Sequence, residues 1–251
     1  MKVYAVKNKD DNVRLNSSSG GVFTALAEQI IDEGGVVIGA AWDNLDVKHI
    51  KVDNKQDISK LRKSKYVKST VDYRLISGLC LFSGTPCQMP KSRDNLILVD
   101  FICHGTPTKE AFREYCSANG IIDMDFRYKE QGWTNFEVRC EKKNGEIVVQ
   151  PFQNNEFMQD FLNDRNLTKP CYNCKFKKFK NNSDIMLGDF WGIGNEYPEF
   201  ADNKGVSVVF IKTQKGQELF DKIKNKIDFI EVELEKVIKY NPSIMKSAER
   251  K

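Results

Sequence analysis

Several features that would assign this chain to a broad class are missing from its 251 residues. No apolar run approaches the roughly 18–20 residues that a membrane-spanning helix needs, and charged residues come too early for a signal peptide. The sequence has no internal repeat and no low-complexity segment. Its 39 basic and 35 acidic residues nearly balance at a net charge of +4, without the basic excess of a nucleic-acid-binding protein. We therefore expect neither a membrane nor a nucleic acid as a partner.

Histidine is scarce, with two residues, and the seven cysteines are too sparse for a disulfide scaffold. Their odd number, together with the lack of a signal peptide, predicts a reducing, cytoplasmic setting. The thiols are then expected to be core residues, nucleophiles or metal ligands.

Strand-like runs alternate with helical patterns, which is typical of an α/β (α+β) protein with a mixed β-sheet core flanked by helices. Strands are expected at 3–6, 36–41, 47–52, 79–82, 96–102, 136–139, 147–149, 185–187 and 206–211. Helices are expected at 22–31, 57–66, 108–116, 156–162, 216–226 and 234–239. A boundary near 72–78 divides a first domain, residues 1–73, from a second, residues 74–251.

Four of the cysteines lie where the pattern predicts loops. Cys87 and Cys103 each follow a buried-type strand, and the carboxyl ends of strands are where open α/β sheets build their sites. Cys171 and Cys174 form a Cys-x-x-Cys pair behind a proline, a spacing at which two thiolates hold one metal centre. The remaining three fall within strand or helix patterns, where a buried thiol acts as a small hydrophobic group.

Two metal centres suit such a set of four thiolates, a tetrahedral zinc ion and an iron–sulfur cluster. Residues 165–180 contain six basic residues and no acidic one, which slightly favours the cluster because its charge becomes more negative on reduction. Phe176 and Phe179 between these lysines would also suit stacking on a single-stranded nucleic acid, but the low overall charge disfavours that interpretation.

A serine- and glycine-rich turn, residues 17–21, precedes the first expected helix. Such a turn places free backbone N–H groups at a helix N-terminus, where the helix dipole favours an anion. Thr24 adds a hydroxyl one turn later. A phosphate and an aromatic ring system would also suit four later residues, Arg62, Lys63, Lys65 and Tyr66. Serine capping of the helix is the more common explanation of such a turn, and no dinucleotide-binding fingerprint or P-loop occurs.

Six ordered motifs together resemble one family. They are SSGGVFTAL at 18–26, SKYV at 64–67, FSGTPCQ at 82–88, VDFICHG at 99–105, CYNCKF at 171–176 and SDIMLGDFWG at 183–192. With them the chain resembles the beta subunits of coenzyme F-420 hydrogenases and dehydrogenases. It is most similar to the bacterial branch associated with polysaccharide pyruvyl transferases.

The resemblance implies an iron–sulfur flavoprotein oxidoreductase that passes electrons between a 4Fe–4S cluster and a hydride donor or acceptor at bound FAD. The hydride carrier would be a deazaflavin coenzyme or another small molecule. The cluster ligands implied by the resemblance are Cys87, Cys103, Cys171 and Cys174. The residues implied near the flavin are Ser18, Ser19, Gly20, Gly21, Thr24, Lys65 and Tyr66, with Ser83, Gly84 and Thr85 between flavin and cluster. His104 is the candidate catalytic residue, as a proton relay or a donor to the cluster.

The sequence departs from the family pattern in three respects. Many relatives carry an N-terminal ferredoxin module that this sequence lacks, so we expect a ferredoxin-like or other redox protein as the electron partner. The segments 70–79 and 88–95 are shorter than usual, and loss of the helix at 88–95 would expose the cluster or loosen the flavin site. Lys63 stands where glycine is common.

One further function stays open on the sequence alone. With zinc in the four-cysteine site, the chain would be a zinc-stabilised, non-catalytic binding or scaffold domain in polysaccharide biosynthesis. The sequence names no substrate, and it leaves a homo-oligomer open.

Overall fold

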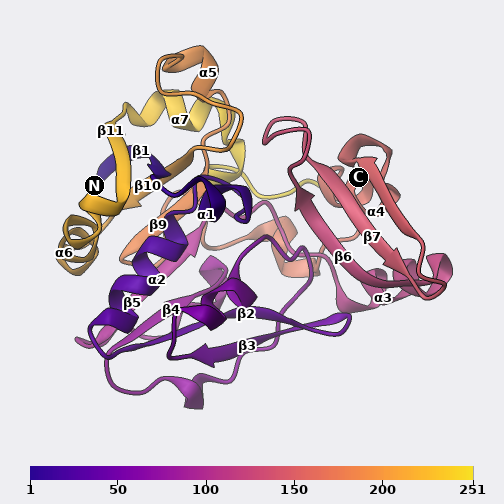
Figure 1. Ribbon diagram of the computed structural model, residues 1–251, viewed down its shortest axis with the longest axis horizontal. Helices are drawn as coiled ribbons and strands as arrows, with labels where there is room; N and C mark the ends of the chain where they lie inside the picture. Colours follow the sequence, from indigo (N-terminus) through magenta and orange to yellow (C-terminus); the bar gives the residue numbers. More distant parts are fainter. Residues whose placement is uncertain (251) are drawn as a thin grey trace.

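The computed structural model describes residues 1–250 and contains two β-sheets, shown in Figure 1. The strands are β1 (Lys2–Asn8), β2 (Val36–Asp43), β3 (Asp46–Val52), β4 (Cys80–Ser83), β5 (Leu96–Phe101), β6 (Ile121–Tyr128), β7 (Glu137–Lys142), β8 (Ile147–Pro151), β9 (Ile185–Asp189), β10 (Ser207–Ile211) and β11 (Ile227–Glu231). The α-helices are α1 (Asp11–Leu15), α2 (Val22–Asp32), α3 (Lys109–Asn119), α4 (Glu156–Leu162), α5 (Ile193–Glu196), α6 (Gln214–Lys222) and α7 (Leu234–Tyr240).

The large sheet has eight strands in the order β11-β1-β10-β9-β5-β4-β2-β3, and the small sheet has the order β6-β7-β8. Figure 1 shows the small sheet on one side of the molecule with α3 and α4 beside it. The mixed sheet flanked by helices that the sequence predicts is confirmed. Strands from both sides of residue 73 share the large sheet, and the division into two domains stays a prediction.

The centre of the large sheet is parallel, and this part positions the site. β2 pairs with β4, β4 with β5, and β5 with β9, all in parallel, whereas the outer pairs are antiparallel. The carboxyl ends of four neighbouring strands therefore meet at one edge, which is where ligand sites form in open α/β sheets.

Helices cover the sheet because their apolar side chains recur at helical spacing. Leu26 and Ile30 of α2 and Phe220 of α6 share a buried cluster with Val37 and Val209 of the sheet. Figure 1 places α5 and α7 together, away from α2, and they pack in a separate cluster. No helix within residues 1–250 combines the length and the apolar character needed to cross a membrane.

The helix that follows the 17–21 turn begins differently from the expectation. The N-cap of α2 is Gly21, with a φ of 77° in the left-handed region, and no side chain caps the helix. The expected serine cap is therefore wrong. A Cβ on Gly20 would lie 2.5 Å from Val6 O and 2.7 Å from Ser207 N, so the turn packs too closely on β1 and β10 for any other residue.

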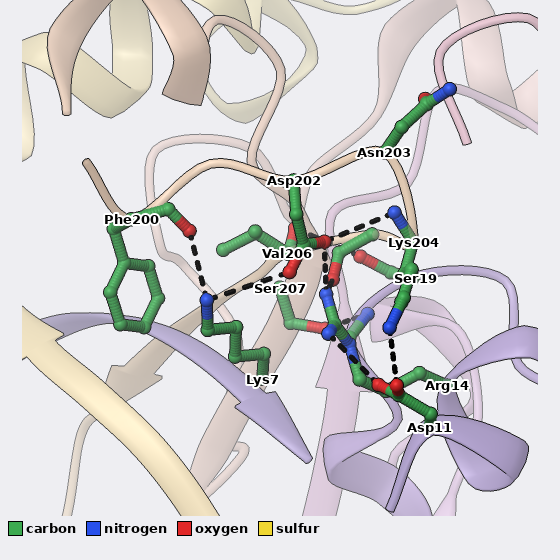
Figure 2. A network of polar contacts seen from close by, with 12 residues as sticks. Lys7, Asp11, Arg14, Ser19, Phe200, Asp202, Asn203, Lys204, Val206 and Ser207 are labelled. Carbon is green, nitrogen blue, oxygen red and sulfur yellow. Dashed lines mark hydrogen bonds and ion pairs between the residues drawn. The ribbon is translucent and has the colours of Figure 1, made fainter. Parts of the chain in front are cut away.

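A polar network holds this turn against residues 200–207 (Figure 2). Arg14 Nη2 donates to Gly205 O at 2.8 Å and also contacts Asp202. Ser19 Oγ donates to Val206 O at 3.0 Å, and Ser207 Oγ accepts from Gly20 N at 3.0 Å. The turn is thus fixed by buried and partly buried hydrogen bonds to a segment far away in the sequence.

The sequence did not predict four of the helices and strands, and one expected helix is shorter. The unexpected elements are α1, α5, β6 and β11, and 57–66 forms only the 3-10 turn η1 (Gln56–Leu61) before the chain extends. The strand β6 carries charged residues at buried positions, such as Arg127, and these interrupt the alternation of apolar and polar residues that indicates a strand. The expected hairpin around Asn144 and Gly145 is confirmed as β7 and β8.

A candidate cysteine site and an adjacent cleft

The parallel centre of the sheet brings Cys87 and Cys103 to the same edge. Cys87 lies in the 3-10 turn η3 (Pro86–Gln88), which follows β4, and Cys103 lies two residues beyond β5. Cys87 is exposed and Cys103 is half-buried. The remaining cysteines outside the loops, Cys80, Cys116 and Cys140, are buried in the core, as expected.

Cys171 and Cys174 reach this edge through a short pairing of two loops. Thr168 N donates to Thr106 O at 2.9 Å and Thr108 N donates to Asn166 O at 3.0 Å, so η5 (Lys169–Asn173) starts beside the Cys103 loop. The approach is close, because a Cβ on Gly105 would lie 2.6 Å from Leu167 Cδ1. Gly105, the glycine of the VDFICHG motif, therefore allows Leu167 to pack closely against this loop.

The four thiols share one electrostatic environment. Burial raises the pKa of Cys103 to about 12, Lys177 opposes this rise, and the charges of Cys171, Cys87 and Cys174 add to it. Thiolates gathered in this way repel one another unless a cation lies between them. Within residues 1–250, no three His, Cys, Asp or Glu side chains are grouped tightly enough to hold a single metal ion.

Polar groups surround the sulfur atoms. Thr85 Oγ1 lies 3.2 Å from Cys87 Sγ, and Thr168 Oγ1 lies 3.2 Å from Cys171 Sγ. Lys177 Nζ donates to Cys103 O at 2.6 Å and thereby places a cation within the site. A donor set of four thiols with hydroxyls and an ammonium group around them fits the electron-rich sulfurs of an iron–sulfur cluster.

His104, the candidate proton relay, is held between α4 and the C-terminal segment. Its Nε2 lies 2.7 Å from Asp164 Oδ1 and 3.2 Å from Phe161 O, and its Nδ1 lies 3.4 Å from Ser243 Oγ. The ring packs edge-on against Phe161 at 5.1 Å. These contacts fix the ring beside Cys103, and a proton-relay role stays a prediction.

A cleft of about 420 Å³ lies between the large sheet and β6 of the small sheet. Trp42 and Ile50 give it an apolar part. Its basic residues are Lys60, Arg62, Lys63 and Lys65, and its acidic residues are Asp123 and Asp125. The volume and the mixture of apolar and charged groups are those of a small-ligand site.

Three of the residues that the resemblance implies near the flavin lie at this cleft or contact its wall. Lys65 lines it, and burial lowers the pKa of Lys65 to about 8. Ser18 Oγ lies 2.8 Å from Ser64 Oγ, and Thr24 Oγ1 accepts from Arg62 Nε at 3.1 Å, so both contact residues of the cleft wall.

The other residues that the resemblance implies near the flavin, or between flavin and cluster, make their contacts elsewhere. Ser19 and Gly20 use their polar groups in bonds to β10 and the segment before it, and Gly21 begins α2. Tyr66 stacks on Phe161 at 4.6 Å. Ser83, Gly84 and Thr85 lead from β4 directly into the Cys87 turn, on the cysteine side of the molecule.

Lys63 shows why glycine is common at its position. Its φ is 64°, in the left-handed region that glycine adopts at little cost. Its ammonium group pairs with Asp125 across the cleft, and this contact accompanies the strained conformation. Residues 89–95 form no helix, and Cys87 close to them is exposed.

Sequence reasoning missed Arg127 of β6 and Lys129, which directly follows this strand. Arg127 binds Asp189 through both terminal nitrogens, at 3.0 and 3.1 Å, and donates to Ser18 O at 3.0 Å. Lys129 Nζ donates to Arg14 O at 2.6 Å, and burial lowers the pKa of Lys129 to about 7. Their partners are far away in the sequence, so only the charges inside a strand pattern could have signalled them.

Comparison with known proteins assigns the chain to a family. Residues 3–74 match the N-terminal part and residues 78–237 the C-terminal part of the coenzyme F420 hydrogenase/dehydrogenase beta subunit. The chain therefore belongs to this family of oxidoreductase subunits, as its motifs predicted.

A solved structure supports the fold. A chain of the xenon-derivatised F420-reducing NiFe hydrogenase complex from Methanosarcina barkeri matches with a TM-score of 0.65 and 18% identity. The match covers 97% of this chain and 88% of that chain. No curated protein sequence matches.

Proposed function

We propose that the chain is an iron–sulfur flavoprotein oxidoreductase in which Cys87, Cys103, Cys171 and Cys174 hold a 4Fe–4S cluster. The observation that carries the proposal is the convergence of four cysteines from three separate segments at the carboxyl edge of parallel strands. Family membership supports the redox chemistry. A ferredoxin-like or other redox protein would be the electron partner, in line with the multi-subunit complex of the structural relative.

The cleft beside Lys65 is the proposed place of FAD. Trp42 and Ile50 offer an apolar surface for a ring system, and Arg62 and Lys65 offer cations for phosphate groups. A bound flavin would supply hydride exchange, and a bound cluster would supply one-electron transfer. The residues of the chain bind, orient and shield these groups. The hydride carrier, the polysaccharide setting and a homo-oligomer stay predictions.

Metal analysis of cysteine variants tests the cluster. Anaerobically purified chain is expected to hold roughly four irons and four acid-labile sulfides. Cys171→Ser and Cys174→Ser are expected to lose both, whereas Cys140→Ser, which changes a thiol buried in the core, is the matched control and is expected to retain them. Full iron in both loop variants would show that the ligand set is wrong. One zinc ion and no flavin would make the chain a zinc-stabilised binding or scaffold domain.

Flavin uptake tests the cleft separately. Arg62→Ala is expected to weaken FAD binding about tenfold, because it removes a cation of the cleft wall, without changing the iron content. Lys48→Ala removes a lysine outside the cleft that is paired with Asp43 at 2.8 Å and serves as the control. Equal FAD affinity of both variants, measured by fluorescence titration, would place the flavin elsewhere.

A further inference from the structure

The segment that follows α7 crosses from the large sheet to the small one. It begins with the 3-10 turn η7 (Pro242–Ile244), and Figure 1 shows it, in yellow, leaving α7 and reaching α4. Ile244 is buried in the cluster that contains Val208 of the large sheet. Ala248 is buried in the cluster that contains Val138 of the small sheet. We call residues 242–249 the C-terminal strap, and it lies outside the residues that match the family.

The strap forms hydrogen bonds at two of the loops that carry cysteines. Cys174 N donates to Ser247 Oγ at 3.0 Å. Lys177 Nζ donates to Ser243 O at 2.8 Å and to Cys103 O at 2.6 Å, so one ammonium group joins the strap to the Cys103 loop. The strap therefore contacts the Cys-x-x-Cys turn directly and the Cys103 loop through Lys177.

Further contacts join the strap to the residue next to Cys103 and to the segment before the Cys-x-x-Cys pair. Glu249 N donates to Asp164 Oδ2 at 2.8 Å, and Asp164 Oδ1 lies 2.7 Å from His104 Nε2. Ser243 Oγ lies 3.4 Å from His104 Nδ1. The two ends of the strap thus reach the same histidine, one directly and the other through Asp164.

The segment that carries the Cys-x-x-Cys pair depends on such contacts, because it has little regular structure of its own. Residues 163–184 contain no α-helix and no strand, only the turn η5. Lys178 and Phe179 have φ values of 58° and 59°, in the left-handed region that residues other than glycine rarely adopt. Such conformations persist only where the surrounding structure determines them. Lys178 N donates to Ile244 O at 2.8 Å, so the strap supplies part of that support.

We propose that the C-terminal strap positions the Cys-x-x-Cys turn against the Cys103 loop and thereby retains the bound cluster, with Ser247 as a positioning residue. The inference rests on the proposed function, because it takes Cys103 and Cys174 as ligands of the cluster. Four thiolates hold such a cluster, so a turn that swings outward exposes iron to water and to chelators. Ser247 acts through Cys174, because its hydroxyl oxygen accepts the hydrogen bond of that residue's main-chain N–H.

The rate of iron release from serine variants tests the strap. Anaerobic, cluster-loaded chain is mixed with an excess of a ferrous chelator, and the coloured iron complex is followed by its absorbance. Ser247→Ala is expected to release iron about fivefold faster than wild type, the factor that corresponds to one lost hydrogen bond. Ser247→Thr keeps the hydroxyl group and is expected to stay within about twofold of wild type.

Ser207→Ala is the matched control. Ser207 Oγ accepts from Gly20 N at 3.0 Å, which is the same kind of bond at the same distance, but it joins β10 to the 17–21 turn. Because Ser207 is more deeply buried than Ser247, its loss is expected to lower stability in urea at least as much. The rate of iron release is nevertheless expected to stay within about twofold of wild type.

Three results overturn the strap. The first is a rate of iron release that is equal in Ser247→Ala and wild type. The second is an equal acceleration in Ser207→Ala, which would make the effect one of general stability. The third is a release from Ser247→Thr that is as fast as from Ser247→Ala, which would show that the hydroxyl group is not what matters.

Hydrogen exchange of the metal-free chain separates this inference from the proposed function. Ser247→Ala is expected to raise the exchange rate of the amides in residues 171–178 about fivefold, whereas Ser207→Ala is expected to leave it unchanged. This result in a chain that binds no iron contradicts the proposed function and supports the strap. A chain that holds iron, but in which Ser247→Ala changes neither the exchange nor the release, supports the function and overturns the strap.

Discussion

Two regions of the molecule are rich in positive charge, and they use it in opposite ways. Beneath the 17–21 turn, Arg14, Arg127 and Lys129 are buried and bound to carboxylates or main-chain carbonyls. Near the cysteine loops, by contrast, there are exposed lysines with no carboxylate within 4.0 Å of their ammonium groups in residues 1–250: Lys169, Lys175, Lys178, Lys180 and Lys246. The first set therefore holds the chain together, whereas the second makes no such contacts and faces water.

The largest expected effect tests the buried set. Asp189→Asn removes the carboxylate that binds Arg127 and that also accepts from Trp133 Nε1 at 2.9 Å. Because Arg127 is only 2% exposed, its charge would remain buried without compensation. The free energy of unfolding is expected to fall by about 3 kcal/mol or more, measured by urea denaturation.

A surface pair provides the control for this variant. Asp123→Asn breaks a contact of 3.6 Å with Arg139 in which the aspartate side chain is 57% exposed, and it is expected to change stability by less than about 1 kcal/mol. The iron content of folded Asp189→Asn protein is expected to match wild type, because the change leaves the cysteine loops in place. A loss no larger than that of the control would mean that the buried cations do not hold the two sheets together.

The sequence predicted the strands that lead to Cys87 and Cys103, but it did not predict the buried cations, and the reason is physical. Cys87 and Cys103 follow strands whose apolar runs are plain in the sequence, and parallel pairing then brings them together. The contact between Arg127 and Ser18 spans 109 residues and depends on how two sheets pack, which no local pattern encodes. The Gly21 cap was missed because packing on β1, and not helix capping, determines the turn.

A smaller effect is expected where the two cysteine-bearing segments meet. Gly105→Ala would place a methyl group 2.6 Å from Leu167 Cδ1, and Leu167 is buried, so it cannot move aside freely. We expect a loss of about 1–2 kcal/mol in stability together with a lower iron content, because residues 166–168 hold η5 in place. Gly194→Ala is the control, since the nearest heavy atom to its new Cβ lies 3.9 Å away. Unchanged iron in Gly105→Ala would show that this loop pairing does not build the site.

The last prediction concerns two aspartates on neighbouring strands, Asp189 of β9 and Asp100 of β5. Asp189 binds a guanidinium, whereas Asp100 is fully buried and its Oδ2 accepts from the amide of Asn181. Burial raises the pKa of Asp100 to about 7, and nearby Ser183 and Lys212 offset only part of the rise. The folded chain then holds a proton that the unfolded chain has lost between about pH 4 and pH 7.

The stabilisation that protonated Asp100 contributes to the folded chain is therefore fully present below about pH 4. It is lost as the pH rises from about 4 to about 7. Asp100→Asn keeps the shape and removes the titration. The stability of wild type minus that of the variant is expected to fall with rising pH by at most ~1.4 kcal/mol per unit between about pH 4 and pH 7 and to stay level above it. Urea denaturation at pH 5.5 and pH 8 measures this difference. A difference that is the same at both values would mean that Asp100 is ionised in the fold, and that the cysteine side of the sheet can compensate a buried charge as fully as Arg127 does for Asp189.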